Sequence, residues 1–85
     1  MTNSAEFLNA ANAIKQYTKN VSQYDLENLY GLYKQSTVGD NNTEKPSFLD
    51  FVGVKKWNGW NRYKTMTTSE AELAYISYVN KIIKD

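Results

Sequence analysis

Apolar side chains recur at intervals of three and four residues in four separate segments, and this spacing constrains the fold more than any other feature. In the first segment Phe7, Ala10 and Ile14 follow it. Residues at these intervals share one face of an α-helix, whereas a half-buried strand would alternate apolar and polar positions. No segment shows that alternation. The pattern therefore predicts an all-α fold, a small four-helix bundle.

The ends of these segments carry helix-capping residues. Ser22 is placed to cap the second helix, and the pairs Asn3 with Glu6 and Thr67 with Glu70 each have the spacing of a capping box. With these signals, the expected helices cover roughly residues 4–17, from 22 to the Val38-Gly39 pair, 53–63, and from 67 onward. Gly39 can adopt the left-handed conformation that ends many helices.

Turn-forming residues fill the long connection between the second and third helices. Residues 40–47 include asparagines, a serine and Pro46, the chain's single proline. Phe48, Leu49 and Phe51 give the end of this connection an apolar side, which predicts an ordered loop packed against the bundle. Trp57 and Trp60, in the third helix, are expected to lie in the core.

Length and composition narrow the possible functions. A chain of 85 residues predicts a single domain over residues 1–85. Because it has no cysteine and no histidine, it lacks disulfides, thiolate metal sites and the commonest general base, so we expect neither an enzyme nor a metal site. The polar start lacks the features of a signal peptide, and no apolar run could span a membrane, which favours the cytoplasm.

The charges are unevenly distributed along a nearly neutral chain. The net charge is +1, yet residues 31–64 hold six cationic and three acidic side chains, and both flanking regions are slightly acidic. A protein that tracks nucleic acid needs a broad basic face. This pattern instead favours one compact polyanionic group as ligand and disfavours nucleic acid.

A candidate site lies in the second helix. Tyr30, Tyr33 and Lys34 share one face of it. Aromatic rings can stack on a flat heterocycle and an ammonium group can bind a phosphate, so the trio suits a nucleotide-like ligand. Tyrosines at helical spacing equally suit a helix interface, and the pattern alone leaves both readings open.

Four motifs then make the chain resemble a known family. These are Leu29–Asp40 (LYGLYKQSTVGD), Lys45-Pro46, Lys56–Trp60 (KWNGW) and Ala74–Ile76 (AYI). Their order and separations closely resemble the acyl-CoA-binding protein family, and the likeness extends from Ala5 to the last helix. It implies the same four-helix fold, with a long ordered loop between helices two and three.

The resemblance also implies a binding site. The family tyrosine that matches Tyr33 stacks on adenine, and the residues that match Tyr30, Lys34 and Lys56 hold the 3′-phosphate of coenzyme A. Further matches are Tyr75, which lines the ligand site, and Lys15, which lies near the headgroup. Side chains expected by resemblance to line the acyl chain are Ala11, Leu26, Leu29 and Phe51.

The function implied is non-covalent binding of medium- to long-chain acyl-CoA by a cytoplasmic monomer that carries and stores these esters without a cofactor. Two alternatives remain at this stage. One is a helical protein-interaction module that keeps the fold, and the other is a nucleic-acid binder, which the net charge of +1 disfavours. Lys55, Arg62 and Lys64 are interpreted as solvated charges without a site.

The sequence departs from the family pattern at several positions. Val52 and Val54 stand where lysines often occur, and Val21 where proline is common. Ser47 replaces the glycine that usually follows the proline, and Thr65 replaces the one that commonly ends the third helix. With fewer peripheral cations, headgroup binding should depend more strongly on Lys34 and Lys56.

Overall fold

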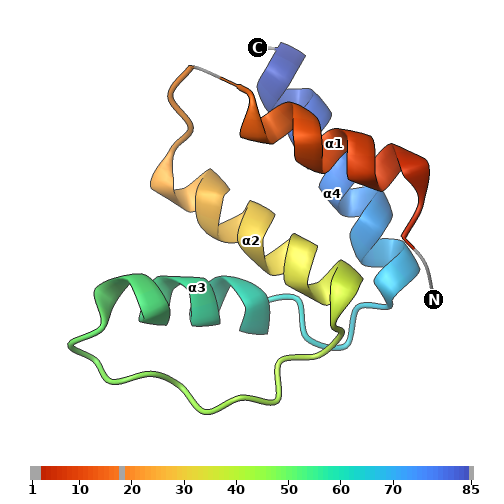
Figure 1. Ribbon diagram of the computed structural model, residues 1–85. Coiled ribbons are helices and arrows are strands. Elements are labelled where there is room, and N and C mark those ends of the chain that lie inside the picture. Colours follow the sequence, from red (N-terminus) through yellow and green to blue (C-terminus); the bar gives the residue numbers. More distant parts are fainter. Residues whose placement is uncertain (1–2, 18, 85) are drawn as a thin grey trace.

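Four α-helices make up most of residues 3–17 and 19–84, the part of the chain that the computed structural model describes (Figure 1). They are α1 (Ala5–Lys15), α2 (Gln23–Thr37), α3 (Phe51–Asn61) and α4 (Thr68–Lys84). Helix α2 packs against both α3 and α4, and α1 packs against α4. The predicted all-α, four-helix architecture is confirmed. Thr18, part of the expected first loop, lies outside the described residues.

Polar caps begin the helices, although not always with the predicted residue. Ser22 Oγ accepts from the Asp25 N–H at 3.1 Å, as predicted. Ser4, not Asn3, caps α1, with Oγ 3.1 Å from the Phe7 nitrogen. The Asn3 amide donates instead to Glu72 Oε2 at 2.6 Å. The predicted Asn3 cap was wrong because a partner on α4 holds that side chain.

The structure confirms the capping box predicted for the start of α4 and the glycine predicted at the end of α2. The Thr67 N–H donates to Glu70 Oε1 at 2.9 Å, and the Glu70 N–H donates to Thr67 Oγ1 at 3.1 Å. The bond from the Thr67 N–H to the carboxylate, with a smaller contribution from the Thr67 side chain, lowers the pKa of Glu70. Gly39, just past α2, has a φ of +102°, so the predicted glycine cap is confirmed.

The third helix starts earlier than predicted. Asp50 caps it, with Oδ1 accepting from the Gly53 N–H at 3.0 Å. The helix therefore begins at Phe51 and ends at Asn61, so the prediction of about 53–63 was shifted toward the C-terminus. An aspartate after an apolar pair was an available capping signal.

The long loop is ordered by polar contacts rather than by apolar packing. Buried Asn41 accepts from the Thr43 N–H at 3.0 Å, and the Trp57 indole donates to the Thr43 carbonyl at 3.1 Å. Phe48 is 80% exposed and Leu49 70% exposed. The expectation that these side chains pack against the bundle was therefore wrong.

The core forms between α1, α2 and α4. Its buried members include Phe7, Leu32 and Val79. On α4 the buried positions are Ala71, Tyr75 and Val79, each four residues from the next, whereas Leu73, which also fits a helical spacing, is exposed. Outside this cluster, Trp60 is buried as predicted. Trp57 is only half-buried, because its ring faces the loop.

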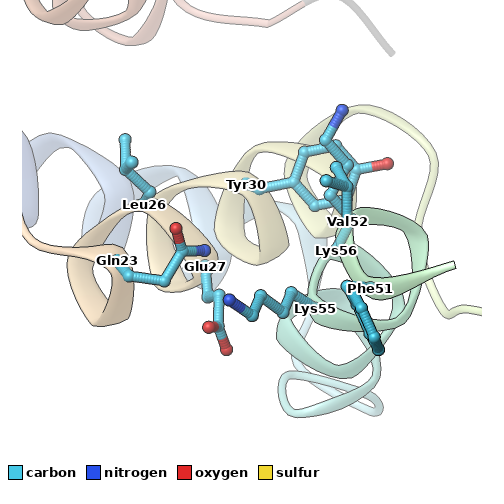
Figure 2. Close-up of a pocket in the computed structure, with 8 residues that line it drawn as sticks. All are labelled: Gln23, Leu26, Glu27, Tyr30, Phe51, Val52, Lys55 and Lys56. Carbon is cyan, nitrogen blue, oxygen red and sulfur yellow. The ribbon is translucent and has the colours of Figure 1, made fainter. Parts of the chain in front are cut away.

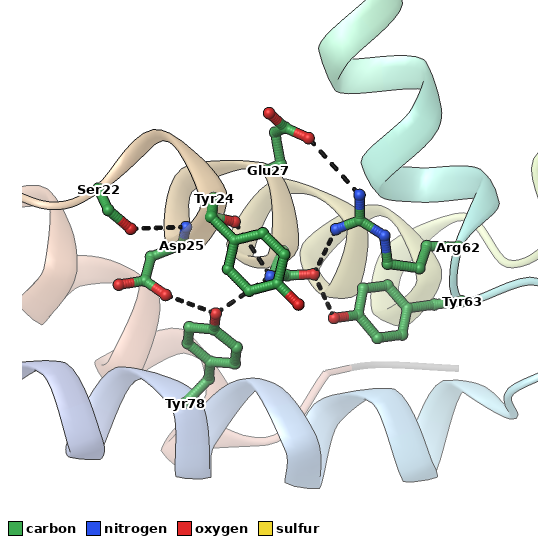
Figure 3. A network of polar contacts seen from close by, with 8 residues as sticks. Ser22, Tyr24, Asp25, Glu27, Arg62, Tyr63 and Tyr78 are labelled. Atoms are coloured by element: carbon green, nitrogen blue, oxygen red, sulfur yellow. Dashed lines mark hydrogen bonds and ion pairs between the residues drawn. The ribbon is translucent and has the colours of Figure 1, made fainter.

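A polar network centred on a buried asparagine joins α2 to α4 and to the residues that directly follow α3 (Figure 3). Asn28, which is 1% exposed, accepts through Oδ1 from Tyr63 Oη at 2.6 Å and from Arg62 Nη1 at 2.7 Å. Its amide donates to Tyr78 Oη, and that hydroxyl donates to Asp25 Oδ1 at 2.6 Å. Burial and this last bond raise the pKa of Tyr78 to about 12. Arg62 is thus a structural partner, and its assignment as a solvated charge was wrong.

Two glycines allow α2 and α3 to touch backbone to backbone. A Cβ on Gly31 would overlap the Gly59 carbonyl, and a Cβ on Gly59 would overlap the Glu27 carbonyl. Both carbonyl groups belong to the backbone, so neither can move aside without shifting a helix. The contact requires glycine at both positions.

We predict that Gly31→Ala and Gly59→Ala each destabilise the fold by about 1–3 kcal/mol or more, because the helices must separate to admit the methyl group. Urea denaturation followed by circular dichroism measures this. Gly53→Ala is the comparison, because its Cβ would meet no backbone but only the Asp50 side chain that caps α3, so its loss should not exceed that of one helix cap, about 1 kcal/mol. Equal stability of all three variants would contradict the tight contact.

Thr65 is held in an unfavourable backbone conformation between α3 and α4. Its φ is +80°, which a β-branched residue rarely adopts. Its N–H donates to Asp40 Oδ1 at 2.7 Å, and the Gln35 amide donates to the same oxygen at 2.8 Å. These two bonds lower the pKa of Asp40. The contacts that hold Thr65 here are made by its backbone, not by its methyl group.

Thr65→Gly should therefore stabilise the protein by about 1 kcal/mol, because glycine adopts this φ without steric cost and keeps the donated N–H. Thermal and urea denaturation would detect the gain. Thr65→Ala is the matched control and should gain little, since alanine retains the Cβ that makes the conformation costly. A glycine variant no more stable than the alanine variant would refute the strain.

Candidate ligand-binding site

The larger of two adjoining grooves lies between α1 and α2 and reaches Tyr75 of α4. Its volume is about 560 Å³. Apolar side chains form most of its wall, with Lys15 at one edge. Leu26 is 48% exposed and Leu8 53% exposed, so apolar surface here faces the solvent. A buried Leu29 closes the floor.

Three aromatic rings meet at one end of this groove. The Phe7 and Tyr33 rings stack with centroids 5.6 Å apart and planes 24° apart. The ring centroid of Tyr75 lies 4.9 Å from that of Phe7 and 6.0 Å from that of Tyr33. Burial raises the pKa of Tyr75, and the neighbouring Tyr33 adds to this. Phe7 is fully buried, whereas Tyr33 is 40% exposed, so the Tyr33 ring is held from the core side and remains accessible.

The smaller groove, of about 400 Å³, lies between α2 and α3 (Figure 2). Phe51, Val52, Lys55 and Lys56 line it from α3. Leu26 and Tyr30 of α2 line both grooves. The two hollows therefore adjoin at these side chains and present apolar walls together with ammonium groups and, in the smaller groove, the carboxylate of Glu27.

Two lysines cross the α2–α3 seam in opposite directions. Lys34 Nζ of α2 lies 4.9 Å from the ring centroid of Trp60 on α3, and Lys56 Nζ of α3 lies 5.5 Å from that of Tyr30 on α2. Both are cation–π distances. The Trp60 indole donates to the Gly39 carbonyl at 2.8 Å, which fixes the ring beneath Lys34. Each cation is thus held over an aromatic ring of the other helix.

The structure places the predicted site residues in three groups. Lys15, Tyr30, Tyr33 and Tyr75 line the larger groove, as do the expected acyl-chain residues Ala11, Leu26 and Leu29. Lys56 and Phe51 line the smaller one, which Tyr30 joins to the first. Lys34 lines neither groove and instead covers Trp60.

Sequence reasoning missed several lining side chains. Leu8 and Asn12 lie beside Ala11 and Lys15 in the larger groove. Their spacing of four residues marks a second face of α1, next to the core face, that could have indicated the groove. Lys55, interpreted as a solvated charge, lines the smaller groove. No pattern in the sequence distinguished it from its neighbours.

The site contains binding groups rather than reactive ones. Within residues 3–17 and 19–84, no cluster of acidic side chains is suited to hold a metal ion. None of the helices described is long and apolar enough to cross a membrane. The fold and the joined grooves define a small helical ligand-binding domain.

Comparison with known proteins places this domain in a family. The family model described as "Acyl CoA binding protein" matches residues 4–79. The chain is 40% identical to the acyl-CoA-binding protein homolog of Drosophila melanogaster over 80 residues, covering 94% of this chain and 93% of that protein. It is 39% identical to homolog 1 of Caenorhabditis elegans over 77 residues, with 91% and 90% covered.

A solved structure agrees with these relatives. The crystal structure of Oryza sativa acyl-CoA-binding protein 2 superposes with a TM-score of 0.89 at 33% identity, covering 93% of this chain and 88% of that one. The chain belongs to the acyl-CoA-binding protein family. This family consists of ligand-binding proteins without enzymatic activity, so the chain is not an enzyme and the resemblance seen in the sequence is confirmed.

Proposed function

We propose that this chain, as one domain over residues 1–85, binds medium- to long-chain acyl-CoA esters without covalent chemistry. The observation that carries the proposal is the position of Tyr30, where an apolar groove and a lysine-bearing groove adjoin. An acyl-CoA needs both environments, because it joins a polyanionic nucleotide to a hydrocarbon tail. The names of the relatives support the same ligand.

The headgroup would bind at the aromatic and cationic side chains of α2 and α3. Tyr33, supported from beneath by Phe7, offers its ring to the adenine, and such a stack is worth about 1–3 kcal/mol. Lys34 and Lys56, with the Tyr30 hydroxyl, would hold the 3′-phosphate. Because a partly exposed cation–π contact is worth only about 0.5–1 kcal/mol and a charge-assisted phosphate contact about 1.5–3 kcal/mol, both lysines would leave their rings for the ligand.

The acyl tail would lie against the apolar walls that the grooves expose. Ala11, Leu26 and Leu29 would contact it in the larger groove, and Phe51 in the smaller one. Each methylene removed from water contributes about 0.8 kcal/mol. A long tail can therefore outweigh the headgroup in the total affinity. Lys15 and Tyr75 complete the lining near the headgroup.

Burying the tail would keep an amphiphilic ester out of micelles and membranes. The proposed role is therefore that of a cytoplasmic carrier and pool former, acting as a monomer and requiring no cofactor. The absence of a reactive constellation among the described groove residues supports storage and transport rather than conversion. A protein-interaction module with the same fold would not bind these esters, so a titration separates the two functions.

Affinity should rise with chain length from eight carbons, by up to about fourfold per methylene, until the grooves are filled. Isothermal titration calorimetry with a series of saturated acyl-CoAs from eight to twenty carbons measures this. Free palmitate, which lacks the nucleotide, is the control and should bind much more weakly. An absence of binding at micromolar concentrations, or equal affinity for palmitate, would contradict the proposal.

Lys34→Ala and Lys56→Ala should each weaken palmitoyl-CoA binding by about 10- to 100-fold, because each removes one charge-assisted phosphate contact. Lys81→Ala, on the exposed surface of α4, is the matched control and should bind like the parent. The loss should shrink for an acyl-pantetheine, which has no 3′-phosphate. If either variant binds palmitoyl-CoA as tightly as the parent, the assignment of the phosphate site is wrong.

A further inference from the structure

Polar side chains line part of the smaller groove, although the acyl tail proposed to lie there is apolar. Gln23 and Glu27 of α2 and Lys55 of α3 line it together with its apolar residues. In Figure 2 the Lys55 side chain extends from α3 toward Gln23 and Glu27, whereas Lys56 lies beside Tyr30. We call Gln23, Glu27 and Lys55 the polar end of the groove.

The charges around the polar end leave one cation without a carboxylate partner. Glu27 is the one acid among the described residues that line the groove, and its Oε1 lies 3.6 Å from Arg62 Nη2. In the part of the chain that the structure describes, this is the one ion pair. Asp50 does not line this groove and accepts from the Gly53 N–H. Arg62 therefore balances Glu27, and the ammonium of the exposed Lys55 side chain adds a net positive charge.

The proposed acyl tail would run toward this polar end. Leu26 lines both grooves, and it lies one helical turn from Gln23. On the opposite wall Lys55 follows Phe51 by four residues, so the two share one face of α3. Gln23 lies two turns, about 10 Å, from Tyr30 along α2. A tail that leaves the headgroup near Tyr30 and follows Leu26 and Phe51 therefore brings its far end to Lys55.

We infer that the polar end recognises an oxygenated terminus on the acyl tail, so that the ligands include acyl-CoA esters whose far end carries a carboxylate. This inference rests on the proposed function and specifies its ligand class. The Lys55 ammonium would pair with the terminal carboxylate, and the Gln23 amide would donate a hydrogen bond to it. A groove with only apolar walls would reject such a tail, because an unpaired carboxylate loses its hydration there.

A hydrocarbon terminus gains less at this position than in the larger groove. Its methyl group would displace water from the Glu27 carboxylate and the Lys55 ammonium without replacing the hydrogen bonds, which offsets part of the hydrophobic gain. A terminal carboxylate replaces that water at Lys55, and Arg62 limits its repulsion from Glu27. The polar end therefore favours an oxygenated terminus over a methyl group.

The test compares two esters of equal chain length by isothermal titration calorimetry. One is the ordinary acyl-CoA, which ends in a methyl group, and the other is its ω-carboxy counterpart, each with twelve, fourteen and sixteen carbons. The ratio of the two dissociation constants is the quantity measured. At one or more of these lengths, we expect the parent to bind the ω-carboxy ester at least as tightly as the methyl ester.

Variants at Lys55 identify the group responsible. Lys55→Met keeps a side chain of similar length without the charge, and it should shift the ratio about fivefold toward the methyl ester, as expected for a charge pair at an exposed site. Lys55→Arg keeps the charge and should retain the parent's ratio. Lys64→Met is the matched control, because Lys64 is an exposed lysine just beyond α3, and it should also retain that ratio.

The possible failures separate the two proposals. A parent that binds palmitoyl-CoA but binds the ω-carboxy ester less tightly at all three lengths would overturn the inference and leave the proposed function intact. An equal loss for both esters in Lys55→Met would assign Lys55 to the headgroup, and no loss for either would show that the terminal carboxylate stays in water. Both results overturn the inference alone. If the parent binds neither ester, the proposed function fails and the inference fails with it.

Discussion

The backbone contact between α2 and α3 at Gly31 and Gly59 is the constraint on which the candidate site depends. Among the helices of residues 3–17 and 19–84, α2 alone packs against α3, whereas α4 packs against both α1 and α2. The distance between α2 and α3 therefore decides whether Lys34 reaches Trp60 and whether Lys56 reaches Tyr30. Adding one side chain at this seam would separate the rings and cations that the proposed function assigns to the same ligand.

A chain of this size has little apolar surface to spare, and its use of polar contacts reflects that limit. Asn28, Asn3 and Asn41 each bridge segments distant in sequence, through Tyr78, Glu72 and Trp57 respectively. Buried amides of this kind stabilise only when their partners are present, so they also specify one arrangement of the helices. Apolar side chains such as Leu8 and Leu26 are thereby left free to line a groove instead of the core.

Exposed apolar side chains gather in the larger groove and at the end of the α2–α3 loop, and their surroundings differ. In the larger groove the apolar surface is concave and borders an aromatic cluster, which suits a tail whose headgroup is recognised nearby. At Phe48 and Leu49 it lies on the loop just before α3, outside the larger groove. Both cost the isolated protein stability, because apolar groups remain in water. That cost is consistent with surfaces retained for binding rather than for folding.

The sequence by itself determined the number, order and type of the helices, the caps at Ser22 and Thr67, the glycine turn at Gly39 and, through its motifs, the family. These features depend on local spacing and on residues a few positions apart. Only the tertiary structure decided that Ser4 and not Asn3 caps α1, that Arg62 is tied to Asn28, that Leu73 faces the solvent, and that Phe48 and Leu49 are exposed. It also decided which candidate residues share a groove, and that Lys34 lies over Trp60 rather than in either hollow. Each of these depends on whether side chains from other segments of the chain come into contact, and helical periodicity carries no information about that.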